Sequence, residues 1–235
     1  MYINRTLIMK YDFFSKYKTV PSYNINLRIN CYPKTHFTSL AFNLNMETVL
    51  HEDKKFENVD YSEKKLFSRE FLNCEFINCN FTKSDLSNND FMDCSFKDCN
   101  FTLTNLQNTG LKNCKFFGCK LMGIDFSKCN SFLFSVSFQD CNLDYSSFFQ
   151  IKMKKTNFID CSIKEVDFAE TDLSMAVFKN CDLLNTSFMR TNLEKADFRS
   201  AFNYSIDPEL NKIKKAKFSS EGLSGLLMKY NIDIE

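Results

Sequence analysis

The eleven cysteines are the side chains of this 235-residue sequence with the widest range of chemistry. Thiolates bind zinc, form disulfides and act as nucleophiles. Zinc sites prefer short gaps between ligands and often include histidine, but the two histidines, His36 and His51, stand outside the strongest repeat of the sequence. The cysteines recur instead at intervals of twenty residues, in three series: Cys74, Cys94 and Cys114; Cys79, Cys99 and Cys119; Cys141, Cys161 and Cys181.

A five-residue period surrounds these cysteines. Large apolar residues, here called centres, recur at every fifth position in two runs, 71–126 and 133–198, and 24 of the 26 centres are Phe or Leu. A small residue stands two places before the centre in 22 of the 26 units, and a polar residue, often Asp or Asn, stands between the two. All cysteines except Cys31 occupy the small position. We therefore expect them to fill a core as small apolar groups, without a metal or a cofactor.

A period of five fits neither an α-helix nor an ordinary strand. In an extended segment, residues two apart point to the same side, so the centre and its small partner both face inward and the remaining two residues turn a corner. Stacked coils of this kind form a solenoid. Since twenty residues hold four units, the sequence predicts an all-β fold, a quadrilateral β-helix. Its expected structural core includes Phe76, Phe96, Phe116, Phe138, Phe158, Phe178, Phe198, Cys79, Cys99, Cys119, Cys141, Cys161 and Cys181.

The repeat divides the chain into three parts. Residues 1–45 show no repeat; they are either an N-terminal extension or precede the natural start at Met46. Residues 46–204 carry the β-helix, with a two-residue register break near 127–133, because Phe126 and Phe138 are twelve residues apart instead of ten. We expect a bulge just before Leu133, which would let the Cys79 series continue into the Cys141 series. Residues 205–235 form a loop, a last repeat and a C-terminal segment.

The C-terminal segment predicts a short helix beginning near Ser219 or Ser220. Its apolar residues follow the i, i+3, i+4, i+7 pattern of one helix face. Such a short helix is marginal alone and must pack on something. Two interpretations remain open: the helix covers the exposed strand edges of the last coil, or it also forms a twofold dimer interface with the strand that follows. The expected interface residues are Leu223, Leu226, Leu227, Tyr230 and Ile232.

Charge and composition exclude several classes of protein. The net charge is +1 for the whole chain and −4 from Met46 onward, which does not favour direct binding of nucleic acid. No apolar run approaches the length of a membrane span, and the N-terminus lacks a signal-peptide pattern, so we expect a cytoplasmic protein without a membrane partner.

The acidic residues of the repeat predict a surface and not a catalytic site. Carboxylates at the polar position before a centre point outward on a convex rod, where nothing forms a pocket. The repeat has no histidine and no Gly-rich phosphate loop, so we expect no enzyme. We expect these outward carboxylates to form a partner-binding acidic face: Asp85, Asp90, Asp125, Asp167, Asp172, Asp182 and Asp197.

The register of small residue, Asp or Asn, and Leu or Phe over residues 56–200 resembles the pentapeptide-repeat proteins, which are right-handed quadrilateral β-helices. The segments IDPELNKI (206–213) and LLMKYNIDI (226–234) resemble the Qnr, MfpA and microcin-immunity branch of that family. This narrower resemblance implies a C-terminal homodimer that binds a type II topoisomerase, DNA gyrase or topoisomerase IV, by DNA mimicry and gives tolerance to quinolones or toxins. The alternative is an interaction scaffold for another partner.

Overall fold

The computed structural model describes residues 48–233, so the expected N-terminal extension, residues 1–45, lies outside the described residues. All strand pairs are parallel, and they form a four-stranded sheet of order β1-β3-β5-β7 and a seven-stranded sheet of order β11-β10-β9-β8-β6-β4-β2. The strands are β1 (Val49–Glu52), β2 (Lys55–Glu57), β3 (Arg69–Leu72), β4 (Glu75–Ile77), β5 (Asp90–Met92), β6 (Ser95–Lys97), β7 (Gly110–Lys112), β8 (Cys114–Phe117), β9 (Val136–Gln139), β10 (Asn157–Ile159) and β11 (Val177–Lys179). The one 3-10 turn within the coils is η1 (Phe126–Lys128).

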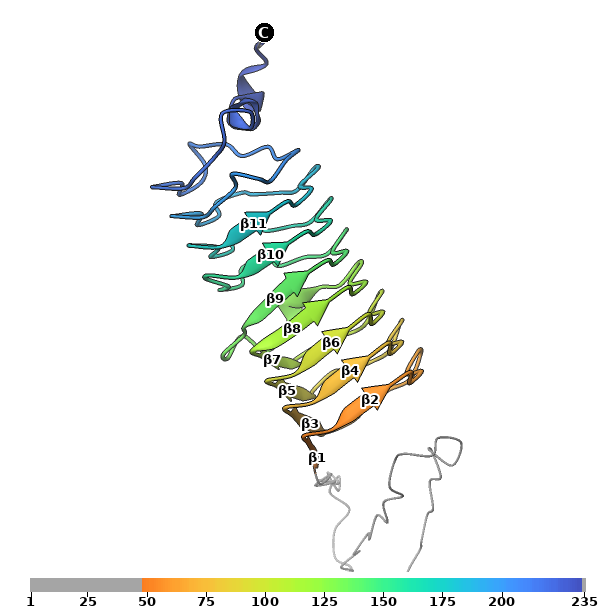
Figure 1. Cartoon of the computed structure of the whole chain (residues 1–235). Coiled ribbons are helices and arrows are strands. Elements are labelled where there is room, and N and C mark those ends of the chain that lie inside the picture. The colour runs from red at the N-terminus through yellow and green to blue at the C-terminus, as the bar shows by residue number, and fades with distance from the viewer. Residues whose placement is uncertain (1–47, 234–235) are drawn as a thin grey trace, which may run out of the picture. The chain divides into compact units, whose positions relative to one another are not determined.

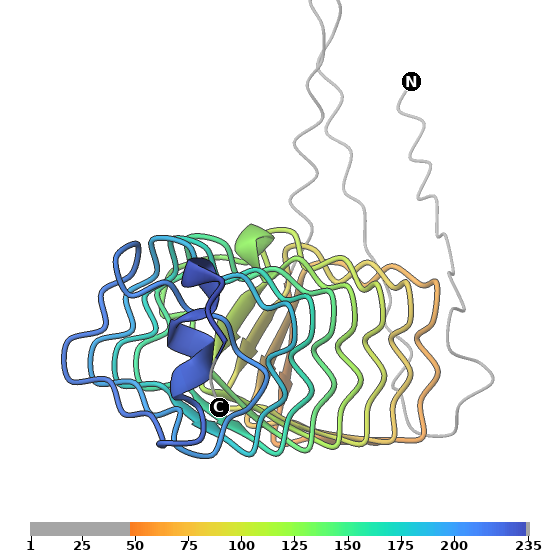
Figure 2. The same cartoon turned by 90° about the horizontal axis from the view of Figure 1, so that it is seen from above.

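Each coil has four sides, which we name A to D in chain order (Figures 1 and 2). In the first four coils, side A is formed by the strands of the four-stranded sheet. Side B is formed by the strands of the seven-stranded sheet. Sides C and D follow and pair with the next coil through single bridges, such as Asn80 with Asn100 on side C and Asp85 with Asn105 on side D. Partners are twenty residues apart, so the predicted quadrilateral β-helix is confirmed.

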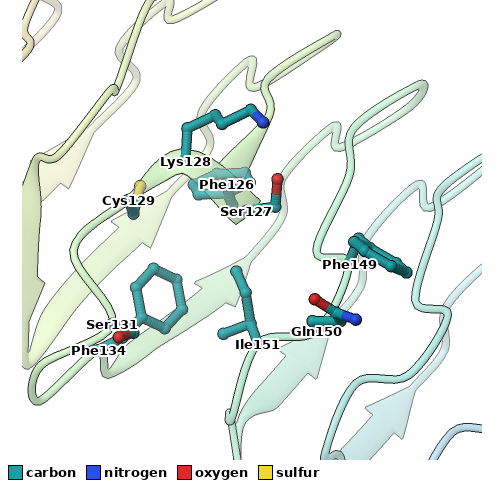
Figure 3. A pocket seen from close by; sticks show the side chains of 9 residues that line it. All are labelled: Phe126, Ser127, Lys128, Cys129, Ser131, Phe134, Phe149, Gln150 and Ile151. Atoms are coloured by element: carbon teal, nitrogen blue, oxygen red, sulfur yellow. The ribbon is translucent and has the colours of Figure 1, made fainter.

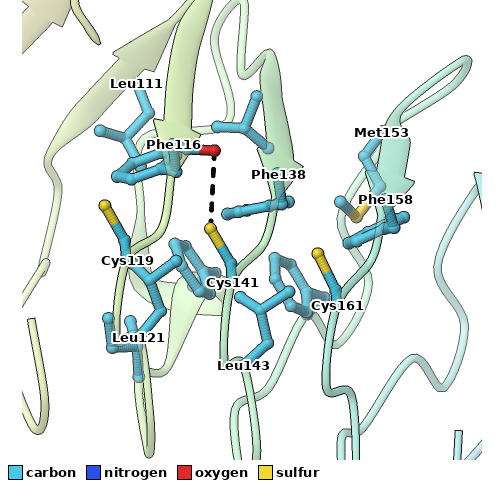
Figure 4. Packing of buried hydrophobic residues seen from close by; sticks show 14 of the residues in the cluster. Leu111, Phe116, Cys119, Leu121, Phe138, Cys141, Leu143, Met153, Phe158 and Cys161 are labelled. Atoms are coloured by element: carbon cyan, nitrogen blue, oxygen red, sulfur yellow. Dashed lines mark hydrogen bonds between the residues drawn. The ribbon is translucent and has the colours of Figure 1, made fainter. Parts of the chain in front are cut away.

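Stacked phenylalanine rings run along the inside of side B, one in each coil. Successive ring centroids lie 4.7 to 5.4 Å apart, close to the spacing of parallel strands. We number the coils 1 to 9 by these rings: Phe56, Phe76, Phe96, Phe116, Phe138, Phe158, Phe178, Phe198 and Phe218. Figure 4 shows Phe116, Phe138 and Phe158 stacked beside the cysteine column.

The small position of each unit holds a side chain with a hydrogen-bond donor more often than an apolar one. The Cys141 thiol donates to the Phe116 carbonyl at 3.5 Å, and the Thr171 hydroxyl donates to the Phe148 carbonyl at 2.7 Å. In both cases the acceptor is the carbonyl of a centre one coil earlier. A thiol or hydroxyl at this position therefore fills the narrow interior and also bonds to the backbone, a role that an alanine would not supply.

The corners are turned by left-handed residues, of which only Gly118 and Gly123 are glycines in the described part of the chain. The residue two places after a centre has a positive φ in nearly every unit; Asn78, Asp93 and Asn180 have φ of 50°, 55° and 53°. Asn and Asp tolerate this region better than other side chains, which explains how a chain with five glycines can turn so many corners. Neighbouring corner side chains also bond between coils, as in Asn180 Nδ2 to Asp160 Oδ1 at 2.9 Å.

The register break lies between Asn130 and Val136. Asn130 pairs with Gly110, twenty residues earlier, but Val136 pairs with Cys114, twenty-two residues earlier. Two extra residues therefore enter within 131–135, and the Cys79 and Cys141 series continue as one column, as the sequence predicts: the Asn142 amide donates to the Cys119 carbonyl at 3.0 Å.

One expectation at the break is wrong. Leu133 was predicted to be an inward centre, but it is 63% exposed with φ of 58°, and Phe134, 8% exposed, faces the core instead. The turn closed by the Phe134 amide and the Ser131 carbonyl shifts the inward position by one residue.

The C-terminal segment lies across the end of the last coil (Figure 2). It forms two 3-10 turns, η2 (Leu223–Leu226) and η3 (Met228–Tyr230), in place of the expected α-helical face, and residues 231–233 form no strand. Gly225 approaches Tyr204 so closely that a Cβ at this residue would lie 2.3 Å from the Tyr204 carbonyl oxygen. The Gly225 carbonyl accepts a hydrogen bond from the Ile206 amide at 2.9 Å. These contacts cap the final coil.

Candidate functional surfaces

The seven aspartates expected to form one acidic face lie on all four sides of the rod. Asp85, Asp125 and Asp167 are on side D; Asp90 and Asp172 are on side A; Asp182 is on side C and Asp197 on side B. The expected single face is therefore not formed by these residues. The physical reason is that units five residues apart belong to successive sides, and only residues one full coil apart share a side.

These aspartates also have structural partners. Six of them accept a hydrogen bond from the backbone N–H two residues later, as Asp85 does from Ser87 at 3.0 Å, which is an Asx-turn that starts the corner. Five form ion pairs, including Asp85 with Lys65 at 2.8 Å and Asp182 with Lys164 at 3.1 Å. The preference for Asp or Asn before a centre is thus explained by the turn.

A different set of carboxylates gathers on sides C and D of coils 5 to 7. The Asp140 amide donates to the carbonyl of Ile159, so Asp140 lies one coil before Asp160 at the corner leading into side C. Seven carboxylates and two cations, Lys164 and Arg190, lie in this region, which gives a net charge of −5. We call it the acidic surface: Asp140, Asp144, Asp160, Glu165, Asp167, Glu170 and Asp182.

Hydrogen bonds and ion pairs favour the ionised form of two of these carboxylates, Glu170 and Asp182. Hydrogen bonds from Gln150 and Arg190 lower the pKa of Glu170. Burial alone would raise the pKa of Asp182, but hydrogen bonds from Asn203 and Lys164 outweigh it and lower that pKa. Sequence reasoning missed five of the seven members, because four stand at left-handed corners and Asp144 directly follows a centre; counting residues by coil would have grouped them.

The thiols of nine of the ten described cysteines are buried inside the rod. Within residues 48–233 all ten cysteines are free, and no three metal-ligating side chains gather there. Burial raises the pKa of the Cys114 thiol to about 12, which suppresses the thiolate. The thirteen core residues expected from the sequence are all buried.

A shallow pocket opens where the register break separates two coils (Figure 3). Sequence reasoning expected no pocket on a convex rod, and the extra residues at the break account for this one. Its lining contains no carboxylate or histidine, and burial raises the pKa of the Cys129 thiol. The titratable groups of its lining are the ammonium of Lys128 and the thiol of Cys129. It is lined by Phe126, Ser127, Lys128, Cys129, Ser131, Phe134, Phe149, Gln150 and Ile151.

The expected dimer residues differ in exposure at the C-terminal end. Leu226 packs against the core of its own chain, and Leu227 is half-buried, whereas Leu223, Tyr230 and Ile232 are 49%, 52% and 55% exposed. The 3-10 geometry separates them, since its residues recur every three positions and not every 3.6.

The two C-terminal segments that resemble the Qnr, MfpA and microcin-immunity branch contact each other. Lys229 lies 2.8 Å from Asp207 and 2.7 Å from Glu209, and the Tyr230 hydroxyl donates to Glu209 at 3.2 Å. The carboxylates of Asp207 and Glu209 raise the pKa of Lys229. The IDPE segment and the KY pair therefore form one polar clamp that fixes the cap to the last loop.

None of the helices within residues 48–233 is long and apolar enough to cross a membrane.

No curated protein matches the chain. Among solved structures, full-length QnrB1, described as a plasmid-mediated fluoroquinolone resistance protein, is 18% identical and covers 78% of this chain and 100% of its own, with a TM-score of 0.45. HetL of Nostoc sp. strain PCC 7120, described as involved in heterocyst differentiation regulation, is 12% identical, covers 74% and 88%, and has a TM-score of 0.52.

The family model described as the pentapeptide repeat region matches residues 69–148 and 131–225, which together span more than half of the chain. These residues are the ones whose centres, donors and left-handed corners form the coils. The chain belongs to the pentapeptide-repeat family.

Proposed function

We propose that this protein is a non-enzymatic, cytoplasmic binder of a type II topoisomerase, DNA gyrase or topoisomerase IV, and that it gives tolerance to quinolones or toxins by DNA mimicry. The observation that carries the proposal is the acidic surface, whose seven carboxylates lie on two adjoining sides of a straight, narrow rod. Duplex DNA is likewise a rigid rod with regularly spaced negative charge. The C-terminal segments that resemble the Qnr, MfpA and microcin-immunity branch support the same partner.

The geometry of the acidic surface suits recognition by a basic groove. Coils repeat about every 4.8 Å, so Asp140 and Asp160 lie one coil apart at the same corner, and the other five carboxylates lie on the two sides that follow it. The Asp144 carboxylate is held in place by the Ser162 hydroxyl at 2.7 Å and the Lys164 amide at 2.9 Å. A fixed array of charges loses little entropy on binding, which favours complementarity with a rigid partner.

A gyrase supercoiling assay with ciprofloxacin tests this function. We expect the purified full chain to restore supercoiling in the presence of the drug, and we expect the effect to weaken as salt is raised, because the contacts are ionic. The triple variant Asp140→Asn, Asp160→Asn, Glu165→Gln should require about tenfold more protein for half-protection, which corresponds to about 1.4 kcal/mol.

The matched control removes three charges from other sides of the rod. Asp53→Asn, Asp93→Asn and Glu70→Gln change two left-handed corner aspartates and one exposed glutamate in coils 1 to 3, away from the acidic surface. Asn is well tolerated at such corners, so both triple variants should fold. An equal loss of gyrase protection in the control variant would show that protection does not depend on where on the rod the negative charges lie. Failure of the unaltered chain to protect gyrase at any concentration in low salt would reject topoisomerase binding.

We further propose that the protein is a homodimer joined at its C-terminal ends. The cap leaves Leu223, Met228 and Ile232 about half exposed or more on the end of the rod. Leu223→Asp should convert a dimer to a monomer in light scattering without loss of the β-helix, because Leu223 points away from its own core. A monomeric unaltered chain at micromolar concentration would contradict the dimer.

A further inference from the structure

The cations of the last four coils collect on the two sides opposite the acidic surface. Lys152, Asp172, Asn192 and Lys212 form one column on side A, since each pairs with the next through a β-bridge. Ten cations and three carboxylates lie on sides A and B of coils 6 to 9, a net charge of +7. We call the ten the basic ridge: Lys152, Lys154, Lys155, Lys179, Lys195, Arg199, Lys212, Lys214, Lys215 and Lys217.

Most cations of the basic ridge have no partner in the described part of the chain. All ten are exposed, and only Lys154, Arg199 and Lys217 form an ion pair with a described residue. Seven lysines therefore lie close together, unneutralised, on a chain that is acidic from Met46 onward. Such a concentration of like charge is unfavourable unless an anionic partner neutralises it.

The corner between sides A and B is the crest of the ridge. Lys155, Lys195 and Lys215 have φ of 61°, 61° and 60°, the left-handed conformation of every corner, and the Lys195 amide donates to the Lys214 carbonyl one coil later at 3.0 Å. Lys152, Lys154, Lys212 and Lys214 lie on one flank, and Lys179, Arg199 and Lys217 lie on the other. The ridge is therefore convex, with cations on both flanks.

We propose that the basic ridge binds the sugar-phosphate backbone of a nucleic-acid duplex. Coils 6 to 9 span three steps of about 4.8 Å, or about 14 Å. A duplex carries one negative charge per about 1.7 Å of axis, or about eight charges over that length, which the ridge matches. A groove of a duplex offers two rows of phosphates, one for each flank.

The same features favour a duplex over other anions. A single acidic peptide segment supplies one row of charge and would leave one flank unpaired. No exposed aromatic side chain lies on the ridge, so stacking of unpaired bases gains nothing, and binding should not require single strands. The net charge of the sequence argued against binding of nucleic acid, but the fold separates the cations from the carboxylates. This inference does not depend on the proposed function.

Fluorescence anisotropy with a labelled 20-base-pair DNA duplex of mixed sequence tests the proposal on the full chain. We expect binding at 50 mM KCl that weakens steeply toward 200 mM, because counterions are released from the duplex. The variant Lys155→Gln, Lys195→Gln, Lys214→Gln, Lys215→Gln should bind at least tenfold more weakly, with a salt slope smaller by about 3 to 4.

The control removes four exposed lysines elsewhere: Lys83→Gln, Lys97→Gln, Lys115→Gln and Lys120→Gln. It should bind within about twofold of the unaltered chain, and far-ultraviolet circular dichroism should show both variants folded. Equal weakening by the control, or no duplex binding at 50 mM KCl, would overturn the proposal. The proposal would also be overturned if a poly-glutamate peptide of the same charge bound as tightly as the duplex and its binding required the ridge lysines. The ridge would then recognise acidic protein segments.

Discussion

Replacing Phe178 by alanine should reveal how far the stacked rings of side B stabilise the rod. Phe178 is fully buried and stacks on Phe158 at 4.8 Å and on Phe198 at 4.7 Å, with interplanar angles of 6° and 9°. Its edge also meets Phe168 and Phe188 at centroid distances of 6.1 and 6.2 Å. The Phe178 ring therefore contacts four others, and its removal affects three coils at once.

The expected cost has two parts. Phe178→Ala removes a fully buried ring and leaves a cavity that the flanking coils cannot close, which costs about 3–5 kcal/mol. Phe178→Leu keeps most of the volume but loses the two stacked aromatic pairs, each worth about 0.5–1.5 kcal/mol, so we expect a cost of about 1–3 kcal/mol. Leu184→Ala, at a side chain that is 45% exposed, should change stability by no more than about 0.5 kcal/mol.

Guanidinium unfolding of the full chain measures these costs. The chain has no tryptophan, so far-ultraviolet circular dichroism follows the transition. A shift of the midpoint at constant slope reports a change of stability. The reasoning is refuted if Phe178→Ala costs less than about 1.5 kcal/mol, or if the leucine variant costs as much as the alanine variant, because stacking and volume would then not be what the rings contribute.

Three further predictions follow from the structure. Burial, together with the charges of Arg69 and Lys54, lowers the pKa of His51 to about 4, so folding favours the neutral imidazole. The free energy of unfolding should therefore fall, by up to about 3 kcal/mol, as the pH drops from 6.5 toward 4. The variant His51→Leu should remove this pH dependence in unfolding titrations. In a Cys31→Ser, Cys129→Ser variant, the nine fully buried thiols should not react with a disulfide reagent until guanidinium unfolds the chain, and fast labelling of the native protein would contradict their place in the core. Asp167→Ala should cost about 0.5–1.5 kcal/mol by removing the acceptor for the Ala169 amide, whereas Asp167→Asn should cost less, as measured by the same unfolding assay.

The sequence by itself determined the fold and most of the core. A centre occurs every five residues, with a small residue two places earlier, and this pattern predicts a short side with two inward residues followed by a corner. The twenty-residue spacing of the cysteines then predicts four sides per coil. The interval from Phe126 to Phe138 also located the register break. These features were readable because each depends on spacing along the chain, which a repeat makes regular.

Other features were decided only by the tertiary structure. At the register break a local turn places Phe134, and not Leu133, in the core. The C-terminal segment forms 3-10 turns and brings Gly225 close to Tyr204. The small position also proved to favour a donor, since centre carbonyls of the previous coil face it.

The distribution of charge is the feature that depends most on the fold. Asp85 and Asp90 are neighbours in the sequence pattern but lie on different sides, whereas Lys152 and Lys212, sixty residues apart, share one column. In a four-sided coil, each successive five-residue unit lies on a different side. Residues separated by one or more complete coils lie on the same side and close together. A sequence that is nearly neutral overall thereby becomes a rod with an acidic surface on one pair of sides and a basic ridge on the other, because winding sorts residues by their position within the coil and not by their order in the chain.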